Sequence, residues 1–124
     1  MSLILIVEDN EKNLKLVRDV LQFKGYKTIE AMTGTEDVRL AVEQNPDLVL
    51  MDIQLPDIDG ITALGQIRAD QRTSKMKVIA ISASVMPDDQ QRIVASGFDA
   101  YITKPINVKN FVETVEQFVG KPKA

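Results

Sequence analysis

The chain has 124 residues, with no cysteine, no histidine, 15 lysines and arginines, 18 aspartates and glutamates, and a formal net charge of -3. This length fits one domain of ordinary size, and the absent residue types exclude disulfides, zinc or iron–sulfur sites built on cysteine or histidine, and catalytic triads that need either residue. The acidic balance without a basic run argues against direct binding to nucleic acid, and no apolar stretch approaches the roughly 20 residues of a membrane span.

Five short runs rich in branched apolar residues predict strands, and a segment with helical periodicity follows each of them. The predicted strands are residues 3–7, 27–31, 47–51, 77–82 and 100–103. The helical segments are marked by apolar residues at helical spacing: Leu14, Val17, Val20 and Leu21; Val38 and Ala41; Ile61, Leu64 and Ile67; Ile93 and Val94; and Val108, Phe111, Val115 and Phe118. Turn residues separate these elements: Gly25, Asn45-Pro46, Gly97 and Gly120. The first strand has no basic segment before it, unlike a secretory signal, so we expect a cytoplasmic protein.

The alternation of strands and helices predicts an α/β fold, with a five-stranded parallel sheet covered by helices on both faces. The strands at 3–7 and 47–51 are continuously apolar, as doubly buried strands should be, whereas the strand at 27–31 is more polar and suits an edge. We therefore expect the flavodoxin-like strand order 2-1-3-4-5. Ligands of such sheets bind beyond the carboxyl ends of the strands, so the residues that follow each strand are the candidate site residues.

Acidic residues follow two strands that this order makes neighbours. Glu8, Asp9 and Asn10 come after the first strand, and Asp52 comes after the third. Three carboxylates in one partly desolvated cleft repel one another unless a cation lies among them. A few oxygen ligands favour Mg²⁺, which keeps several of its waters, over a Ca²⁺ cage.

The remaining strand ends add a hydroxyl and an ammonium. Ser82 ends the fourth strand and Lys104 follows the fifth. A metal ion, a hydroxyl donor and an ammonium around one carboxylate suit a phosphoryl group carried on Asp52. Lys104 stands directly before Pro105, and such a pair permits a cis bond and a fixed loop that aims the ammonium inward.

Each of these residues also has a purely structural interpretation. The acidic and amide side chains of Glu8, Asp9 and Asn10 also suit the start of a helix, as caps and as complements to its dipole. Ser82 could begin the fourth helix with the turn around Pro87, and Lys104 could be a solvated surface lysine. Asp52 is flanked by apolar residues on both sides, which favours a site over a turn.

Taken together, these residues closely resemble receiver domains of two-component response regulators. The resemblance rests on Glu8-Asp9, on Asp52 with Pro56 and Gly60 after it, on Ser82-Ala83, on Tyr101 and on Lys104-Pro105, and it spans essentially the whole chain. The stretches 7–16 and 51–56 are most similar to stand-alone receivers of the DivK type.

The resemblance implies roles for the site residues. Asp52 would accept a phosphoryl group from a sensor histidine kinase or a histidine phosphotransfer protein. Asp9, Asp52 and the backbone carbonyl of Gln54 would bind Mg²⁺, and Glu8 would act through water. Lys104 would pair with a phosphoryl oxygen.

The resemblance also implies a switch. Ser82 would move to hydrogen-bond the phosphoryl group, and Tyr101 would follow, which alters the surface made by the fourth helix, fifth strand and fifth helix. A downstream protein would bind there. The alternative interpretation of Tyr101 is an amphipathic residue packed at the sheet edge.

Some positions depart from the usual receiver pattern. Ser82 stands where threonine is more usual, and it lacks the methyl group that would couple it to Tyr101. Gln54 and Ser84 occupy positions that tune the access of hydrolytic water in this family. We expect residues 1–120 to form the receiver domain and residues 121–124 a short tail, although the chain could also be cut from a hybrid kinase or a longer response regulator.

Three other functions compete with this interpretation. A phosphatase with an aspartate nucleophile would need a second aspartate where Gln54 stands, and it would need a cap domain. A flavin- or nucleotide-binding protein would place a glycine-rich turn after the first strand, where Glu8 and Asp9 would instead repel phosphate. A protein-interaction domain that is never phosphorylated would have no reason to keep the complete set of site residues.

Overall fold

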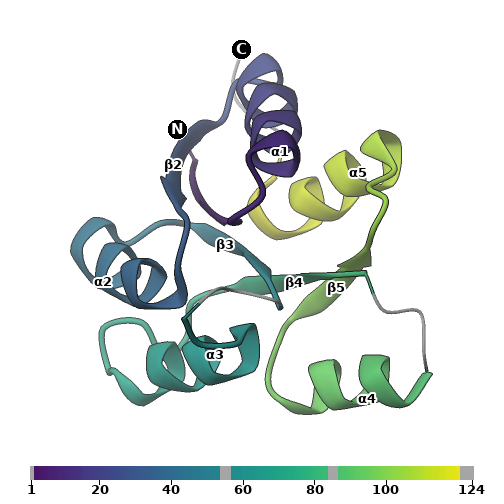
Figure 1. Ribbon diagram of the computed structural model, residues 1–124. Coiled ribbons are helices and arrows are strands. Elements are labelled where there is room, and N and C mark those ends of the chain that lie inside the picture. Colours follow the sequence, from purple (N-terminus) through teal and green to yellow (C-terminus); the bar gives the residue numbers. More distant parts are fainter. Residues whose placement is uncertain (1, 54–56, 84–86, 121–124) are drawn as a thin grey trace.

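The computed structural model describes residues 2–53, 57–83 and 87–120 (Figure 1). Within these residues five strands alternate with five helices: β1 Leu3–Val7, α1 Glu11–Phe23, β2 Lys27–Ala31, α2 Gly34–Gln44, β3 Leu48–Asp52, α3 Gly60–Ala69, β4 Val78–Ser82, α4 Pro87–Ala95, β5 Ala100–Thr103 and α5 Val108–Val119. The strands form one parallel sheet in the order β2-β1-β3-β4-β5, which confirms the predicted fold. None of the helices in the described ranges is long and apolar enough to cross a membrane.

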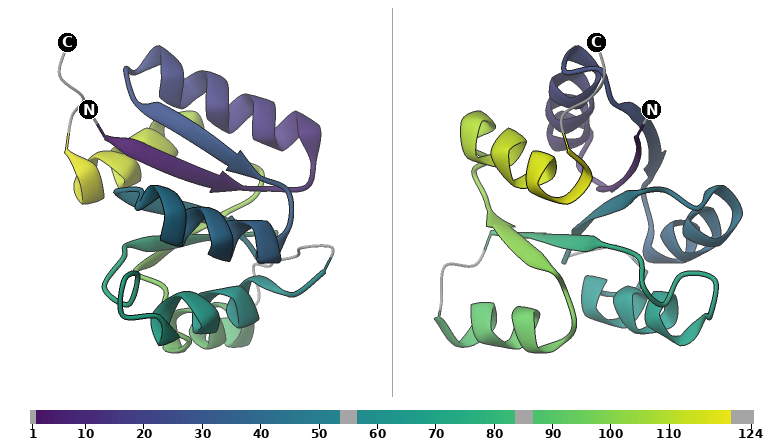
Figure 2. Two further views of the ribbon diagram at one scale, coloured as in Figure 1. Left: turned by 90° about the vertical axis from the view of Figure 1, so that its left-hand side faces the viewer. Right: turned by 180° about the vertical axis from the view of Figure 1, so that it is seen from behind.

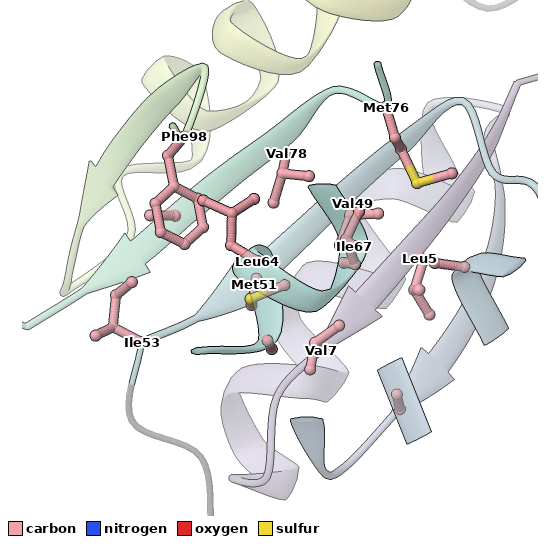
Figure 3. Packing of buried hydrophobic residues seen from close by; sticks show 14 of the residues in the cluster. Leu5, Val7, Val49, Met51, Ile53, Leu64, Ile67, Met76, Val78 and Phe98 are labelled. Carbon is pink, nitrogen blue, oxygen red and sulfur yellow. The ribbon is translucent and has the colours of Figure 1, made fainter. Parts of the chain in front are cut away.

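Helices cover both faces of the sheet. Figures 1 and 2 show α1 and α5 on one face and α2, α3 and α4 on the other. Alternate side chains of the two central strands point to opposite faces, so Leu5 and Met51 enter the cluster beneath α2–α4 (Figure 3), whereas Ile6 and Leu50 enter the cluster beneath α1 and α5. Both sides of β1 and β3 are therefore buried, which explains their continuously apolar sequences.

The polar character of β2 follows from its place at one edge of the sheet. Thr28 accepts a hydrogen bond from Gln22 (2.9 Å), and Glu30 pairs with Arg18 (3.1 Å), so these two polar side chains of β2 bind exposed or half-exposed residues of α1. Ile29 points to the opposite face and packs against the cluster beneath α2–α4. The strand thus has one polar and one apolar face, as expected for an edge.

Helix ends lie close to the predicted turn residues. Asn10 caps α1, since its side chain accepts hydrogen bonds from the amides of Lys12 and Asn13 at 3.0 and 3.1 Å. Asn45 ends α2 in the left-handed conformation, with φ of 47°. Pro87 is the first residue of α4, where its missing amide hydrogen costs nothing.

The predicted boundaries of two strands are wrong by one residue. The third strand runs from Leu48 to Asp52 rather than over 47–51, because Asp47 turns aside to bind Leu3 through both its amide and its side chain, each at 2.8 Å. Asp52 instead pairs with Ile81 as the last residue of the ladder. The fourth strand begins at Val78, one residue later than predicted.

One arginine ties together two connections at the amino edge of the sheet, the one between α3 and β4 and the one between α4 and β5. Arg68 at the end of α3 donates hydrogen bonds to the backbone carbonyls of Ser74, Met76 and Gly97 and to Asp99, with which it forms an ion pair at 3.2 Å. The same carboxylate oxygen of Asp99 accepts the amide of Val78 at 2.8 Å, where β4 begins. The side chain of Arg68 therefore serves as the hydrogen-bond donor for several backbone carbonyls at once.

Replacing Arg68 by alanine is expected to lower the free energy of unfolding by about 2–3 kcal/mol, because several hydrogen bonds from one charged group are lost together and such bonds are among the stronger ones. Urea unfolding followed by circular dichroism measures the change. Arg39→Ala is the control, since Arg39 forms only an exposed pair with Glu43, and its loss should be about 0.5 kcal/mol or less. Equal losses for the two variants would contradict the proposed role of Arg68.

Candidate functional site

The candidate site residues gather at the carboxyl edge of the sheet. Glu8 and Asp9 follow β1, and Asp52 ends the neighbouring strand β3. Ser82 ends β4, and Lys104 follows β5. The strand order brings these positions together because the carboxyl ends of parallel strands share one edge.

Three carboxylates form the centre of this site. One oxygen each from Glu8, Asp9 and Asp52 lies within 4.8 Å of the others, as the sequence predicted. Glu8 and Asp52 are buried, with 3% and 4% of their surface exposed, whereas Asp9 is exposed. Hard oxygen ligands that are open to solvent on one side fit Mg²⁺, which retains part of its water shell in proteins.

Lys104 compensates the charge of the buried carboxylates. Its ammonium lies 2.7 Å from Asp52 Oδ2 and 3.3 Å from Glu8 Oε2. Burial lowers the pKa of Lys104, but the hydrogen bond and the charge of Asp52, together with Glu8, raise the pKa above its ordinary value. Lys104 therefore stays protonated beside Asp52. The Lys104–Pro105 bond is cis, as the sequence allowed.

Glu8 holds its proton more strongly than an ordinary glutamate. Burial raises the pKa of Glu8 from 4.5 to about 7, and the hydrogen bond and charge of Asp52 add to the rise. Two neighbouring carboxyl groups that are shielded from water carry one negative charge between them more easily than two negative charges. The crowding of acidic groups is thus relieved partly by a proton and partly by Lys104.

The sequence left open whether the residues after β1 cap a helix or form the site, and the structure shows both. Asn10 caps α1, whereas Glu8 and Asp9 belong to the carboxylate cluster. The backbone holds Glu8 in place: its amide donates to the carbonyl of Ala31 at 3.0 Å, and Glu8 Oε1 accepts the amide of Asn10 at 3.2 Å. Asn10 therefore caps the helix, while the residues just before it, Glu8 and Asp9, contribute to the site.

The start of α3 lies against the end of β3. The amide of Gly60 donates to the carbonyl of Ile53 at 2.8 Å, and a Cβ atom at position 60 would lie 2.8 Å from the carbonyl oxygen of Asp52 and 2.9 Å from Ile53 Cα. Backbone atoms cannot move away from such a contact cheaply, so only glycine fits. This close approach explains the glycine that follows Asp52 in the motif.

Ser82 and Tyr101, the two residues of the switch interpretation, lie on the neighbouring strands β4 and β5. Ser82 is buried at the end of β4, next to β3, and its carbonyl accepts the amide of Lys104 at 2.8 Å. Ser82 therefore does not begin α4. Tyr101 is half-buried on β5 and packs against the cluster beneath α2–α4. Gln54 and Ser84 lie outside the described residues.

Tyr101 also lines two recesses on the surface. One, of about 440 Å³, lies beside α4 and is lined by Pro87, Gln90, Gln91, Val94, Ala95 and Tyr101. The other, of about 210 Å³, lies toward α5 and is lined by Tyr101, Ile102, Thr103, Pro105, Asn107, Asn110 and Thr114. The position of the Tyr101 ring therefore shapes both recesses.

The structure also shows two acidic residues that the sequence analysis missed. Asp57 binds the first turn of α2, and Asp37 is completely buried on the inner side of that helix. The sequence around each looks like an ordinary polar connection or helix start. For Asp37, however, the helical spacing to Ala41 places an acidic residue on the apolar side of the helix, and this was a detectable signal.

Comparison with known proteins gives consistent results. Residues 4–116 match the family described as the response regulator receiver domain. The chain is 44% identical over 117 residues to the polar-differentiation response regulator DivK of Brucella ovis, which covers 94% of this chain and 95% of that protein, and it is equally similar to DivK of Brucella suis.

Solved structures agree with these relatives. The receiver domain of a sensor histidine kinase from Pseudomonas aeruginosa, crystallised with a magnesium ion coordinated in its active-site cleft, is 30% identical and superposes with a TM-score of 0.89 over 97% of this chain and 98% of that chain. The receiver domain of a response regulator from Saccharomyces cerevisiae, crystallised with a histidine phosphotransfer protein, is 28% identical, with a TM-score of 0.88 over 94% and 88% of the two chains.

Proposed function

The chain belongs to the response regulator receiver domain family, whose members act in phosphorylation-based signalling, and on this premise we propose that Asp52 is the residue that accepts the phosphoryl group. The observation that carries the proposal is the contact of 2.7 Å between Asp52 and the ammonium of Lys104, inside a cluster of three carboxylates. A buried carboxylate with its own counter-cation is held in one orientation and is ready to accept a group that brings more negative charge.

The donor is the phosphohistidine of a sensor histidine kinase or a histidine phosphotransfer protein. A carboxylate oxygen of Asp52 forms a bond to phosphorus as the bond between phosphorus and the histidine nitrogen breaks. Lys104 neutralises a phosphoryl oxygen while it remains beside Asp52. The yeast receiver crystallised with its phosphotransfer protein supports this class of partner.

Asp9 and Asp52 are the residues that would hold Mg²⁺, with Glu8 acting through a water molecule and the carbonyl of Gln54, outside the described residues, as a further ligand. A bound Mg²⁺ neutralises charge on the transferring group. The magnesium ion in the receiver domain from Pseudomonas aeruginosa supports this assignment, as does the spacing of the three carboxylates.

The response to phosphorylation involves Ser82 and Tyr101. The hydroxyl of Ser82 turns to the phosphoryl group, and Tyr101 takes a new position, which changes the two recesses that it lines. The surface of α4, β5 and α5 is then the part that a downstream protein recognises. We assign this behaviour to one receiver domain over residues 1–120.

Asp52→Asn tests the proposal directly. The wild type, incubated with acetyl phosphate and Mg²⁺, is expected to gain one phosphoryl group by intact-mass spectrometry, and the variant none, because an amide is a poor nucleophile that lacks the negative charge of a carboxylate. Asp88→Asn, an exposed position on α4, is the matched control and should be labelled like the wild type. Full labelling of Asp52→Asn would reject Asp52 as the acceptor.

A further inference from the structure

The connection between β3 and α3 is hydrogen-bonded to the first turn of another helix, α2. Asp57 Oδ1 accepts the amide of Gly34 at 2.8 Å, and Oδ2 accepts both the amide and the hydroxyl of Thr35, at 3.0 and 2.5 Å. Gly34 and Thr35 are the first two residues of α2. We call Asp57, Gly34 and Thr35 the α2 anchor.

A close apolar contact accompanies these hydrogen bonds. Ile58 packs so tightly on α2 that a Cβ atom added to Gly34 would lie 2.4 Å from Ile58 Cγ1. The carboxylate of Asp57 also stays ionised, since the hydrogen bond from the Thr35 hydroxyl and those from backbone amides lower its pKa. A negative charge at the amino end of a helix is stabilised by the helix dipole.

The residues just before α2 are connected to the carboxylate cluster as well, through Glu8. Ala31, the last residue of β2, accepts the amide of Glu8 through its carbonyl at 3.0 Å, and Thr33 then caps α2 by accepting the amide of Glu36. The start of α2 thus lies between two connections. One leads from β1 through Glu8 and Asp9, and the other leads from β3 to Asp57.

The connection after β3 has few other fixed points in the described residues. Its base is closed by the hydrogen bond from the Gly60 amide to the Ile53 carbonyl, and Asp59 caps α3 by accepting the amide of Thr62 at 2.7 Å. Both contacts lie within the connection and its own helix. Ile53 is tied to β4, because its amide donates to the carbonyl of Ile81 at 3.1 Å. Within the described residues, the α2 anchor is the hydrogen-bonded attachment of Asp57 to a different helix.

We propose that Asp57 is a positioning residue of the phosphorylation site: by binding the first turn of α2 it fixes the short turn that joins α2 to β2, whose last residue, Ala31, holds the amide of Glu8, so that the affinity for Mg²⁺ depends on α2. This inference rests on the function proposed above. It adds to that function a residue that contacts neither the metal cluster nor the phosphoryl group.

The test compares Mg²⁺ binding, followed by nuclear magnetic resonance titration with MgCl₂, in the wild type and in Asp57→Ala. The dissociation constant is expected to rise about tenfold, the usual size of the effect when a residue that orients a metal ligand is lost. Asp59→Ala is the matched control, because it removes the same charge from the same connection but breaks only the cap of α3. Its dissociation constant should stay within about twofold of the wild type.

A second variant tests the anchor from the other side. Thr35→Val keeps every charge and removes only the hydroxyl bound to Asp57, and it should weaken Mg²⁺ binding about threefold. Combined with Asp57→Ala it should add nothing further, since both changes break one contact. Melting temperatures measured in parallel show whether the chain is folded, and both single aspartate variants should lose stability, whereas only Asp57→Ala should lose Mg²⁺ affinity.

Equal Mg²⁺ affinities in Asp57→Ala and Asp59→Ala, or additive effects of Asp57→Ala and Thr35→Val, would overturn the role of Asp57. A wild type that binds Mg²⁺ but accepts no phosphoryl group from acetyl phosphate would overturn the proposed function instead, and the Mg²⁺ comparison would still decide the role of Asp57. A wild type that does not bind Mg²⁺ would overturn both.

Discussion

Replacing Asp37 by alanine is expected to stabilise the protein at pH 8 by about 3 kcal/mol. Asp37 is 0% exposed, and neither of its carboxylate oxygens has a hydrogen-bond partner among the described residues. Burial raises the pKa of Asp37 from 3.8 to about 7. An ionised carboxylate is therefore poorly tolerated at this position, and the folded protein keeps the proton that the unfolded chain releases.

The sign of the pH dependence follows from these two pKa values. Below about pH 4 Asp37 is neutral in both states and has no effect on stability. Between about pH 4 and 7 the folded state binds more protons, so the free energy of unfolding falls as the pH rises, by on the order of 4 kcal/mol for the whole interval. Above pH 7 the loss is complete. A small cavity left by the side chain offsets part of the gain in the alanine variant.

Urea unfolding between pH 4.5 and 8.5 measures this effect as the difference between Asp37→Ala and the wild type. The difference should be near zero at the acidic end and should grow as the pH rises. Asp37→Asn should remove the same pH dependence with a smaller gain, because it leaves a polar amide buried. A gain that does not change with pH would show that Asp37 is not the titrating group.

Replacing Lys104 by alanine is expected to lower the free energy of unfolding by about 3 kcal/mol in the absence of Mg²⁺, because it leaves the charge of a buried carboxylate uncompensated. Lys104 is the cation that contacts both Asp52 and Glu8 within the described residues, and its side chain is only 20% exposed. Saturating Mg²⁺ should recover most of the loss, since a divalent cation replaces the missing charge.

Unfolding curves with and without MgCl₂ measure this prediction. Lys15→Ala is the control, because Lys15 forms only an exposed pair with Asp19, at 70% and 50% side-chain exposure, and its loss should be about 0.5 kcal/mol or less in either condition. The phosphorylated Lys104→Ala protein should also bind a downstream partner no better than its unphosphorylated form. A variant as stable as the wild type without Mg²⁺ would show that the carboxylates do not need this lysine.

The fold could be predicted because it depends on patterns that are local in the sequence. Apolar runs alternate with helical periodicity along the whole chain, and the contrast between the apolar β1 and the polar β2 indicated an edge position for β2, consistent with the flavodoxin-like strand order. The main site residues followed from the same reasoning, since a parallel sheet brings the residues after its strands to one edge. The structure bears out the convergence of the acidic residues there.

The contacts of Asp57 and Arg68 and the ends of the third strand could not be predicted, because they depend on tertiary contacts that no local sequence pattern indicates. Asp57 meets Gly34 across 23 residues, and Arg68 meets Asp99 across 31. Such pairs become visible only when the helices are packed. The error at the third strand has the same origin, because Asp47 leaves the ladder to bind Leu3 at the start of β1. Sequence periodicity locates an element, but tertiary contacts decide where it ends.

The position of β2 at the edge of the sheet also bears on how the protein behaves at high concentration. An edge strand exposes unpaired backbone groups to which the strand of another molecule can add, and this is a route to aggregation. On β2, Lys27 is exposed and Glu30 carries a second charge beside the same edge. Charged side chains oppose such pairing between copies. The polar residues that identified β2 as an edge therefore also help to keep separate molecules from joining their sheets.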